Sequence, residues 1–190
     1  MKIVTPSVKI EAITPNPLEL IERAGRTCYQ SEPRGDPEAF VRMLIRRGHE
    51  SVLEHAAATF RIICDRGVSH ELVRHRIASY SQESTRYCSY GDEITVIRPQ
   101  GIDGVEWLEA MYACEQAYLS MLRRGVSAQV ARSVLPNSLK TEVVMTANFR
   151  EWRHFLKLRT APAAHPDMRL VAGLIRKCFE IVVPIIVEDL

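Results

Sequence analysis

Hydrophobic and polar residues alternate, or recur at helical spacing, along most of the chain, and this pattern predicts a mixture of strands and helices. Asn16-Pro17 and Asp36-Pro37 each combine an N-cap residue with proline at the first helical position, which is a helix start signal. Gly48 ends the second of these helices. In chain order, strands are expected at residues 2–13, 56–64, 94–97 and 141–146, and helices are expected to begin near residues 17, 37, 67, 105, 127, 148 and 167. The helix that begins near residue 67 is expected to run to residue 76. This order indicates a single α+β domain over residues 1–190, with a mixed or antiparallel sheet flanked by helices.

The helix expected to begin near Asn148 has two distinct sides. Its predicted apolar side carries Phe149, Trp152, Phe155 and Leu158, at spacings of three. Arg150 and His154 stand four residues apart, so they share a different, polar side. The pattern therefore predicts a helix with one side packed on the core and one side free for a site.

Composition and charge narrow the class of protein. The chain has 190 residues, 46% hydrophobic and 25% charged, which is ordinary for a globular protein and excludes disordered and fibrous classes. A net charge of +2 gives no reason to expect a nucleic-acid partner. No apolar run is long enough to span a membrane. Five scattered cysteines without a C-x-x-C pair indicate a reducing, cytoplasmic protein whose thiols mostly serve as small core residues.

Residues 74–87 have a composition that core packing does not explain. Three arginines, one histidine and three serines stand there, with few apolar residues between them. Guanidinium groups bind phosphate or carboxylate in a bidentate manner, and hydroxyl groups complete such a cradle, so a bound phosphate ester is one interpretation. A solvated loop crossed by surface ion pairs is the other. Arg74 and Arg76 meet one anion if the helix ends before them, or serve two ligands if it continues.

Residues 48–55 place two histidines, two glutamates and a serine at the entrance of an expected strand. Either they line a site, or Ser51 caps a turn of helix and both histidines are exposed. His70-Glu71 with His75 resembles the zinc motif H-E-x-x-H, but the second histidine comes one residue late and leaves the shared helix face. We therefore predict no metal site.

Four segments in order resemble the flavin-dependent thymidylate synthases. Their signature is similar to Arg74-His75-Arg76, seven intervening residues, then Ser84 and Arg86-Tyr87. The other three are residues 48–55, 132–136 and 148–159. Ser81 and Gln82 depart from the Asn and Glu of many members, and His154 from an Asn in some.

The resemblance implies an enzyme that methylates dUMP to dTMP, with methylenetetrahydrofolate as carbon donor, FAD as cofactor and NADPH as reductant. It also implies a homotetramer with active sites shared between subunits. Arg159 would be the catalytic residue, since a fixed guanidinium can stabilise the negative charge that makes uracil C5 nucleophilic. By position, FAD would contact Ser51, Arg74, His75, Arg76, Gln82, Asn148, Phe149, Arg150 and His154. By position, dUMP would contact Glu71, Leu72, Val73, Arg74, Gln82, Glu83, Ser84, Thr85, Arg86, Arg132 and Arg159.

Two rival hypotheses stand beside this one. A binding module could use residues 74–86 for RNA or a nucleotide without catalysis, and such a protein would be colourless. A flavoprotein oxidase of different specificity would bind flavin but would not depend on Arg159 for dTMP formation.

Overall fold

The computed structural model describes residues 1–33 and 35–190, and it contains a sheet, a smaller strand pair and helices at both ends. The strands are β1 (Lys2–Val4), β2 (Ser7–Ile13), β3 (Ala57–Asp65), β4 (Ser79–Gln82), β5 (Thr95–Ile97) and β6 (Lys140–Asn148). The α-helices are α1 (Pro17–Thr27), α2 (Pro37–Arg46), α3 (Arg66–Leu72), α4 (Val105–Arg123), α5 (Ala128–Ala131), α6 (Phe149–Arg159) and α7 (Pro166–Val182). The 3-10 helices are η1 (Glu50–His55), η2 (Arg132–Val134) and η3 (Pro184–Ile186). The expected α+β class is confirmed.

The main sheet is antiparallel and has the strand order β2-β3-β6-β4. β3 and β6 pair along nine residues each, from Ala57 opposite Asn148 to Asp65 opposite Lys140. Their side chains alternate between buried and half-buried, so one face of the sheet packs on the core and the other stays partly open. β1 and β5 form a separate parallel pair.

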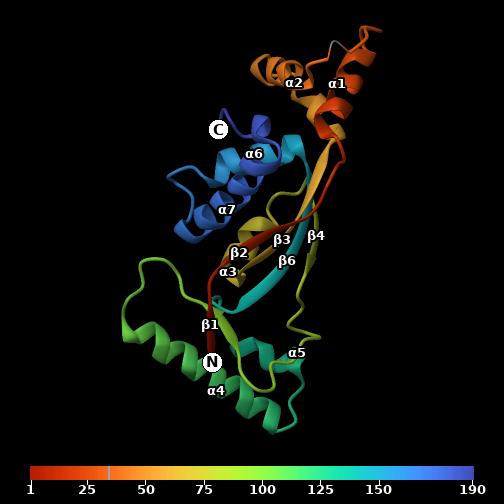
Figure 1. Ribbon diagram of the computed structural model, residues 1–190. Coiled ribbons are helices and arrows are strands. Elements are labelled where there is room, and N and C mark those ends of the chain that lie inside the picture. Colours follow the sequence, from red (N-terminus) through yellow and green to blue (C-terminus); the bar gives the residue numbers. More distant parts are fainter. Residues whose placement is uncertain (34) are drawn as a thin grey trace.

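The core lies between the sheet and helices α6 and α7, which run across one face (Figure 1). Aromatic rings join the three layers, because Phe60 of β3 meets Trp152 of α6 at 4.9 Å and Phe179 of α7 at 5.2 Å between ring centroids. Trp152 Nε1 also donates a hydrogen bond of 3.0 Å to the Ala58 carbonyl oxygen. Helix α6 is therefore fixed against β3 by both packing and a polar contact.

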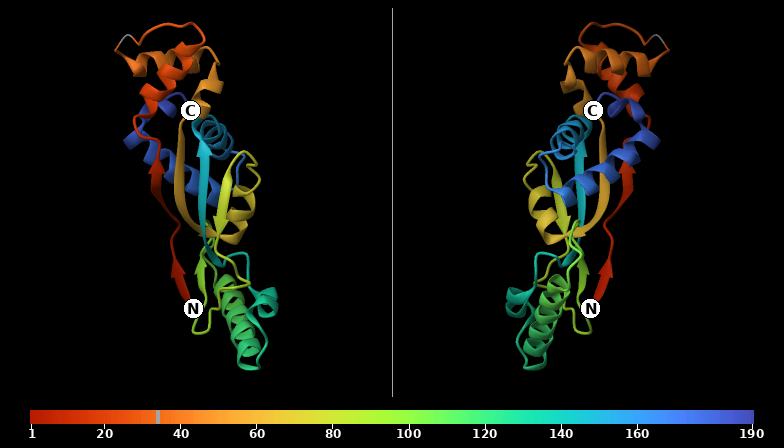
Figure 2. Two further views of the ribbon diagram at one scale, coloured as in Figure 1. Left: turned by 90° about the vertical axis from the view of Figure 1, so that its right-hand side faces the viewer. Right: turned by 90° about the vertical axis from the view of Figure 1, so that its left-hand side faces the viewer.

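The chain is elongated, with α1 and α2 at one end and α4 and α5 at the other (Figure 2). A second buried cluster, separate from the main core, lies at the α4 end and includes Ile94, Val96 and Tyr118. The predicted helix boundaries follow local signals. Asp36 accepts a hydrogen bond from Ala39 N at the start of α2, and Gly48 follows α2 with the positive φ of 72° that favours glycine.

Four expectations need correction. β4 was not expected, because its polar residues become a strand only by pairing with β6. Helix α3 ends at Leu72, earlier than the expected 76. Leu158 is 48% exposed and does not join the buried side of α6. Among the cysteines, only Cys64 is fully buried, so the thiols are not mostly core residues; all five are free.

Candidate active site

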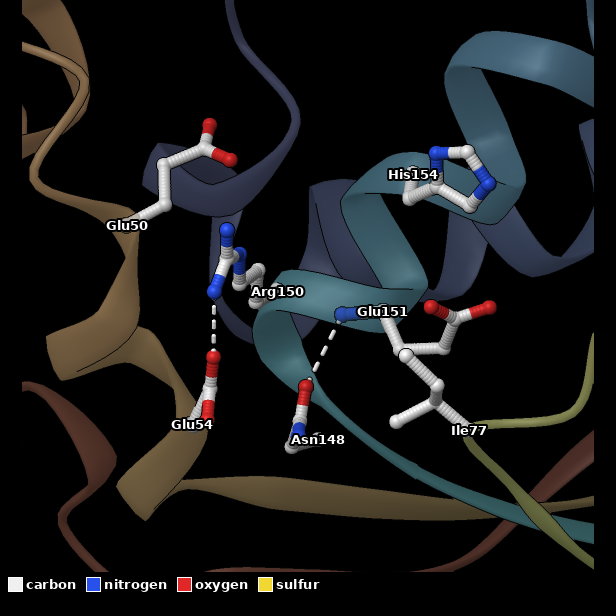
Figure 3. Close-up of a pocket in the computed structure, with 7 residues that line it drawn as sticks. All are labelled: Glu50, Glu54, Ile77, Asn148, Arg150, Glu151 and His154. Carbon is white, nitrogen blue, oxygen red and sulfur yellow. Dashed lines mark hydrogen bonds and ion pairs between the residues drawn. The ribbon is translucent and has the colours of Figure 1, made fainter.

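The turn after α3 and helix α6 face each other and enclose two adjoining cavities. The larger has a volume of about 460 Å³ and is lined by Glu50, Glu54, Ile77, Asn148, Arg150, Glu151 and His154 (Figure 3). The smaller, of about 210 Å³, is lined by Arg74, His75, Arg76, Ile77, Glu151, His154, Leu158 and Arg159. Three residues line both cavities, so the two form one continuous depression. Its walls come from η1, from the segment that follows α3, and from α6.

Residues at the N-terminus of α6 line the larger cavity. Asn148 caps this helix by accepting a hydrogen bond of 2.9 Å from Glu151 N, as Figure 3 shows. Arg150 and His154 both line the cavity, which confirms that they share one side of the helix. Arg150 Nη1 donates to Glu54 of η1 at 2.5 Å, and Glu50 of η1 lines the same wall. The segment at 48–55 thus contributes its glutamates, while His49, Ser51 and His55 are exposed.

Arg74 and Arg76 are exposed and line the smaller cavity together. Because α3 ends at Leu72, both follow the helix, which matches the alternative in which they approach one ligand. Within residues 1–33 and 35–190, neither guanidinium forms an ion pair with a carboxylate. Two guanidinium groups on one wall are able to bind an anion between them.

His75 is buried between these two arginines and lies against α6. Its Nδ1 is 3.1 Å from Glu151 Oε1, and Arg159 Nε donates to its Nε2 at 3.0 Å. The Phe155 ring packs on it with centroids 4.9 Å apart. Burial, followed by the positive charge of Arg159, lowers the pKa of His75 from its usual value, against the opposing hydrogen bond to Glu151.

Arg159 is held in place on three sides. Beyond its bond to His75, its Nη1 donates to Glu71 Oε2 at 2.6 Å and its Nη2 donates to the Glu71 carbonyl oxygen at 3.2 Å. The Glu71 contacts use one N–H of each terminal nitrogen, so each retains a second N–H for a ligand. The catalytic residue expected from the sequence is therefore a fixed guanidinium at the edge of the smaller cavity.

The residues expected to hold the substrate divide into two groups. Arg74 and Arg159 line the smaller cavity, and Glu71 is bonded to Arg159 beside it. Leu72 is buried and Val73 is exposed, and neither lines the two cavities. Most of the others lie at the end of β4 and in the segment that follows it. A third cavity there, of about 320 Å³ and on the open face of the sheet, is lined by Gln82 and Glu83 among others.

Several side chains of the second group are engaged within the chain. The Glu83 carboxylate accepts from Tyr90 Oη at 2.6 Å and from Lys140 Nζ at 2.8 Å, and Gln82 Nε2 donates to Ser69 Oγ at 2.9 Å. The backbone N–H of Arg86 bonds to Ser84 Oγ at 3.3 Å, which fixes the turn. The side chains of Gln82 and Glu83 thus hold this segment against its neighbours.

Two arginines expected in the substrate site lie outside all three cavities. Arg86 Nε donates to Gln129 of α5 at 3.2 Å, and Arg132 Nη1 lies 3.5 Å from Thr85 Oγ1. Both are exposed. Neither of them lines the cavity that Arg159 lines.

The sequence did not single out Glu151 or Ile77 as lining residues, although both face the larger cavity in Figure 3. Glu151 stands four residues before Phe155 and eight before Arg159, so helical spacing could have placed it on the same stripe. Phe149, expected near the cofactor, is buried in the core and can offer only its backbone.

His75, Glu151 and His154 offer metal-ligating atoms within 4.8 Å of one another. Both ring nitrogens of His75 already take part in hydrogen bonds, and four arginines line the surrounding cavities. The guanidinium of Arg159 at Nε2 of His75 opposes a cation at that atom. We therefore interpret this group as a hydrogen-bonding network.

No helix in the described residues 1–33 and 35–190 combines the length and the apolar character needed to cross a bilayer.

Comparison with known proteins identifies the family. A family model described as thymidylate synthase complementing protein matches residues 9–185. The flavin-dependent thymidylate synthase of Geobacter sulfurreducens is 40% identical over 192 residues, covering 93% of this chain and 83% of the relative. That of Mycobacterium sp. (strain JLS) is 38% identical over 199 residues, covering 89% of this chain and 78% of the relative.

A solved structure has the same fold. The UMP/dUMP methylase PolB from Streptomyces cacaoi, bound with 5-Br dUMP, matches with a TM-score of 0.83 at 23% identity, covering 99% of this chain and 96% of that chain. The matching family model spans most of the chain, and the relatives align over nearly all of it. The chain therefore belongs to the flavin-dependent thymidylate synthases, flavoenzymes that methylate dUMP to dTMP with FAD as cofactor, methylenetetrahydrofolate as carbon donor and NADPH as reductant.

Proposed function

We propose that this chain carries out the family's reaction in the depression between α6 and the turn after α3, with Arg159 as the catalytic residue. The observation that carries this assignment is the placement of Arg159, fixed by Glu71 and His75, beside two arginines without internal partners. A colourless binding module has no need for a guanidinium held this rigidly next to an anion cradle.

The residues of the depression fit FAD. Arg74 and Arg76 are suited to the pyrophosphate, because guanidinium groups bind phosphate oxygens in a bidentate manner. Ile77 and Leu158 expose apolar surface, 69% and 48% respectively, against which a flat ring can pack. Arg150, His154 and the amide of Asn148 provide polar contacts at the other end. FAD would supply the redox chemistry, while these residues bind and orient it.

Arg159 would act on the uracil ring. Each of its terminal nitrogens keeps one N–H free of Glu71, and these can donate to a carbonyl or a ring nitrogen. As negative charge develops on the ring, a guanidinium already in position stabilises it without reorganising. Glu71 and His75 would keep the guanidinium at that position.

The phosphate of dUMP would be bound by the segment that follows β4. Ser84 and Thr85 provide hydroxyl groups, and Arg86 and Arg132 provide exposed guanidinium groups. Gln82 and Glu83 would act here by holding the segment through Ser69, Tyr90 and Lys140. Ser51 is an exposed residue of η1 that does not line the cavity, so it would contact the cofactor only at the cavity's edge.

We propose that the complete site forms between subunits of a homotetramer. The support is that Arg159 lines the smaller cavity whereas Arg132 lines none of the three cavities described above, while both carry the substrate assignment. A second copy would bring the missing arginine over the depression. Residues 1–190 would form one catalytic domain. The protein would be cytoplasmic, because five free cysteines are typical of a reducing compartment.

The Arg159→Ala variant tests the catalytic assignment. We expect dTMP formation to fall by about 100-fold or more, since losing one positioned donor costs roughly 3 kcal/mol. The flavin absorbance should persist, because Arg74, Arg76 and Arg150 are unchanged. The measurements are dTMP formation with methylenetetrahydrofolate and NADPH, and the visible spectrum of the purified protein.

Arg176→Ala is the matched control, since Arg176 pairs with Glu180 on the exposed side of α7, away from the cavities. It should retain wild-type turnover. Unchanged dTMP formation in Arg159→Ala would remove Arg159 from the catalytic role, and a colourless wild-type protein that consumes no NADPH would favour the binding module.

A further inference from the structure

Three residues in one row along α6 all contact the side chain of His75. Glu151, Phe155 and Arg159 are spaced by four residues, so they lie one above another on a helix face. Glu151 meets Nδ1 of His75, Phe155 packs on the ring, and Arg159 meets Nε2. The imidazole thus lies between a carboxylate at the start of the helix and a guanidinium at its end.

The two polar contacts allow only one neutral form of the imidazole. A carboxylate accepts hydrogen bonds, so Nδ1 of His75 carries the proton when it bonds to Glu151. Arg159 Nε can only donate, so Nε2 must present its lone pair. The opposite form would place two N–H groups face to face at Nε2. The hydrogen-bond acceptor at Glu151 therefore decides whether His75 Nε2 can accept the hydrogen bond from Arg159 Nε.

The surroundings of Glu151 give it a fixed position. Its side chain is 8% exposed, and its backbone N–H bonds to Asn148 Oδ1 at 2.9 Å. On the other side, the carbonyl oxygen of His75 lies 2.8 Å from Tyr80 Oη, which holds the turn. Both ends of the Glu151–His75 contact are thus constrained by neighbours on different elements.

We propose that Glu151 is a positioning residue for the reaction: by accepting the proton of His75 Nδ1 it holds the imidazole in the form that anchors Arg159. This inference rests on the proposed catalytic role of Arg159. It adds a residue that acts through two others, and it predicts that the hydrogen-bond acceptor at position 151 matters more than its charge.

Two substitutions separate the acceptor from the charge. In Glu151→Gln the amide oxygen still accepts from Nδ1, so we expect kcat to fall by about fivefold or less. In Glu151→Leu no acceptor remains, and we expect kcat to fall by about 10- to 100-fold, with a smaller change in the KM for dUMP. Glu180→Gln, on the exposed side of α7, is the matched control with wild-type kcat.

A double-mutant cycle tests whether Glu151 acts through Arg159. In an Arg159→Lys background the Nε donor is absent, so adding Glu151→Leu should change kcat by less than about twofold. A general structural role would lower kcat by the same factor in both backgrounds, and that result would overturn the proposal.

A spectroscopic measurement keeps the test independent of turnover. In protein labelled with ¹⁵N-histidine, the His75 side chain should show a protonated Nδ1 in the wild type and in Glu151→Gln. In Glu151→Leu the proton should move to Nε2. A His75 signal that keeps its Nδ1 proton in Glu151→Leu would contradict the proposal. If Arg159→Ala is inactive while Glu151→Leu is fully active, this inference fails and the proposed function stands; an active Arg159→Ala removes the proposed function itself.

Discussion

At the scale of single residues, the site depends on a histidine that stays neutral. His75 is 5% exposed, and the groups that face it are Glu151, His154 and Arg159 of α6. Arg74 and Arg76 flank it in the chain and line the same cavity. Burial is the largest effect on its pKa and lowers it, as does the positive charge of Arg159, and Glu151 only partly opposes them.

The lowered pKa predicts a loss of turnover in acid. Protonation of Nε2 would place an N–H and a positive charge against Arg159, so kcat should decrease as the pH falls through a midpoint below about 6.5, the ordinary histidine value. Titration of the His75 imidazole by NMR should give the same midpoint. A midpoint above 6.5 would contradict the assignment.

The same shift has a consequence for stability. Because the folded-state pKa of His75 is lower than the unfolded one, the unfolded chain binds the proton more readily. The contribution to the free energy of unfolding is therefore complete above about pH 6.5 and is lost as the pH falls through the folded-state pKa.

At the scale of elements, α6 joins the core to the site. Its buried side carries Trp152 and Phe155, whose rings contact each other, and Trp152 also meets the rings of Phe60 and Phe179. Its other sides carry Arg150, Glu151 and Arg159 into the cavities. Any shift of the helix on β3 would therefore move the guanidinium of Arg159.

The Trp152→Ala variant tests this coupling. Removing a fully buried indole leaves a cavity and should lower the free energy of unfolding by about 3–5 kcal/mol. It also removes the hydrogen bond to the Ala58 carbonyl oxygen. Denaturant unfolding measures the loss. Tyr112→Ala is a control, because Tyr112 is 50% exposed on α4 and its removal should cost well under 1 kcal/mol.

At the scale of the whole molecule, two arginines expected to bind the substrate lie far apart in the elongated chain. Arg132 precedes β6 and lies near α5, whereas Arg159 ends the helix that follows β6. Figures 1 and 2 show α5 and the start of α6 at opposite ends of that strand, which spans roughly 30 Å at 3.3 Å per residue. This separation favours a site completed by a second copy.

A mixing experiment tests the shared site. Arg132→Ala and Arg159→Ala should each be nearly inactive alone. If the two arginines of one site come from different chains, co-refolded mixtures contain sites with neither substitution and should recover up to about a quarter of wild-type turnover under random pairing. Absence of recovery, with mixed oligomers verified by mass spectrometry, would place both arginines of a site in the same chain.

Local signals in the sequence predicted much of the framework. N-cap and proline pairs marked α1 and α2, Asn148 marked α6, and alternation marked β2, while the strands expected at 56–64 and 141–146 are β3 and β6. The arginine-rich segment from Arg74 was also visible, because no buried element has such a composition. β4 was missed since its polar sequence has no strand signal of its own.

The sequence by itself determined where helices begin, which faces are apolar, and which segment gathers arginine and serine side chains, because each of these depends on neighbours within a few residues. Only the tertiary structure decided that His75 meets Glu151 from 76 residues away, that Glu71 holds Arg159 from 88 residues away, and that Arg86 and Arg132 stand apart from both. These contacts depend on how α3 and α6 pack on opposite ends of β3 and β6. Long-range packing of that kind leaves no periodic trace in the chain.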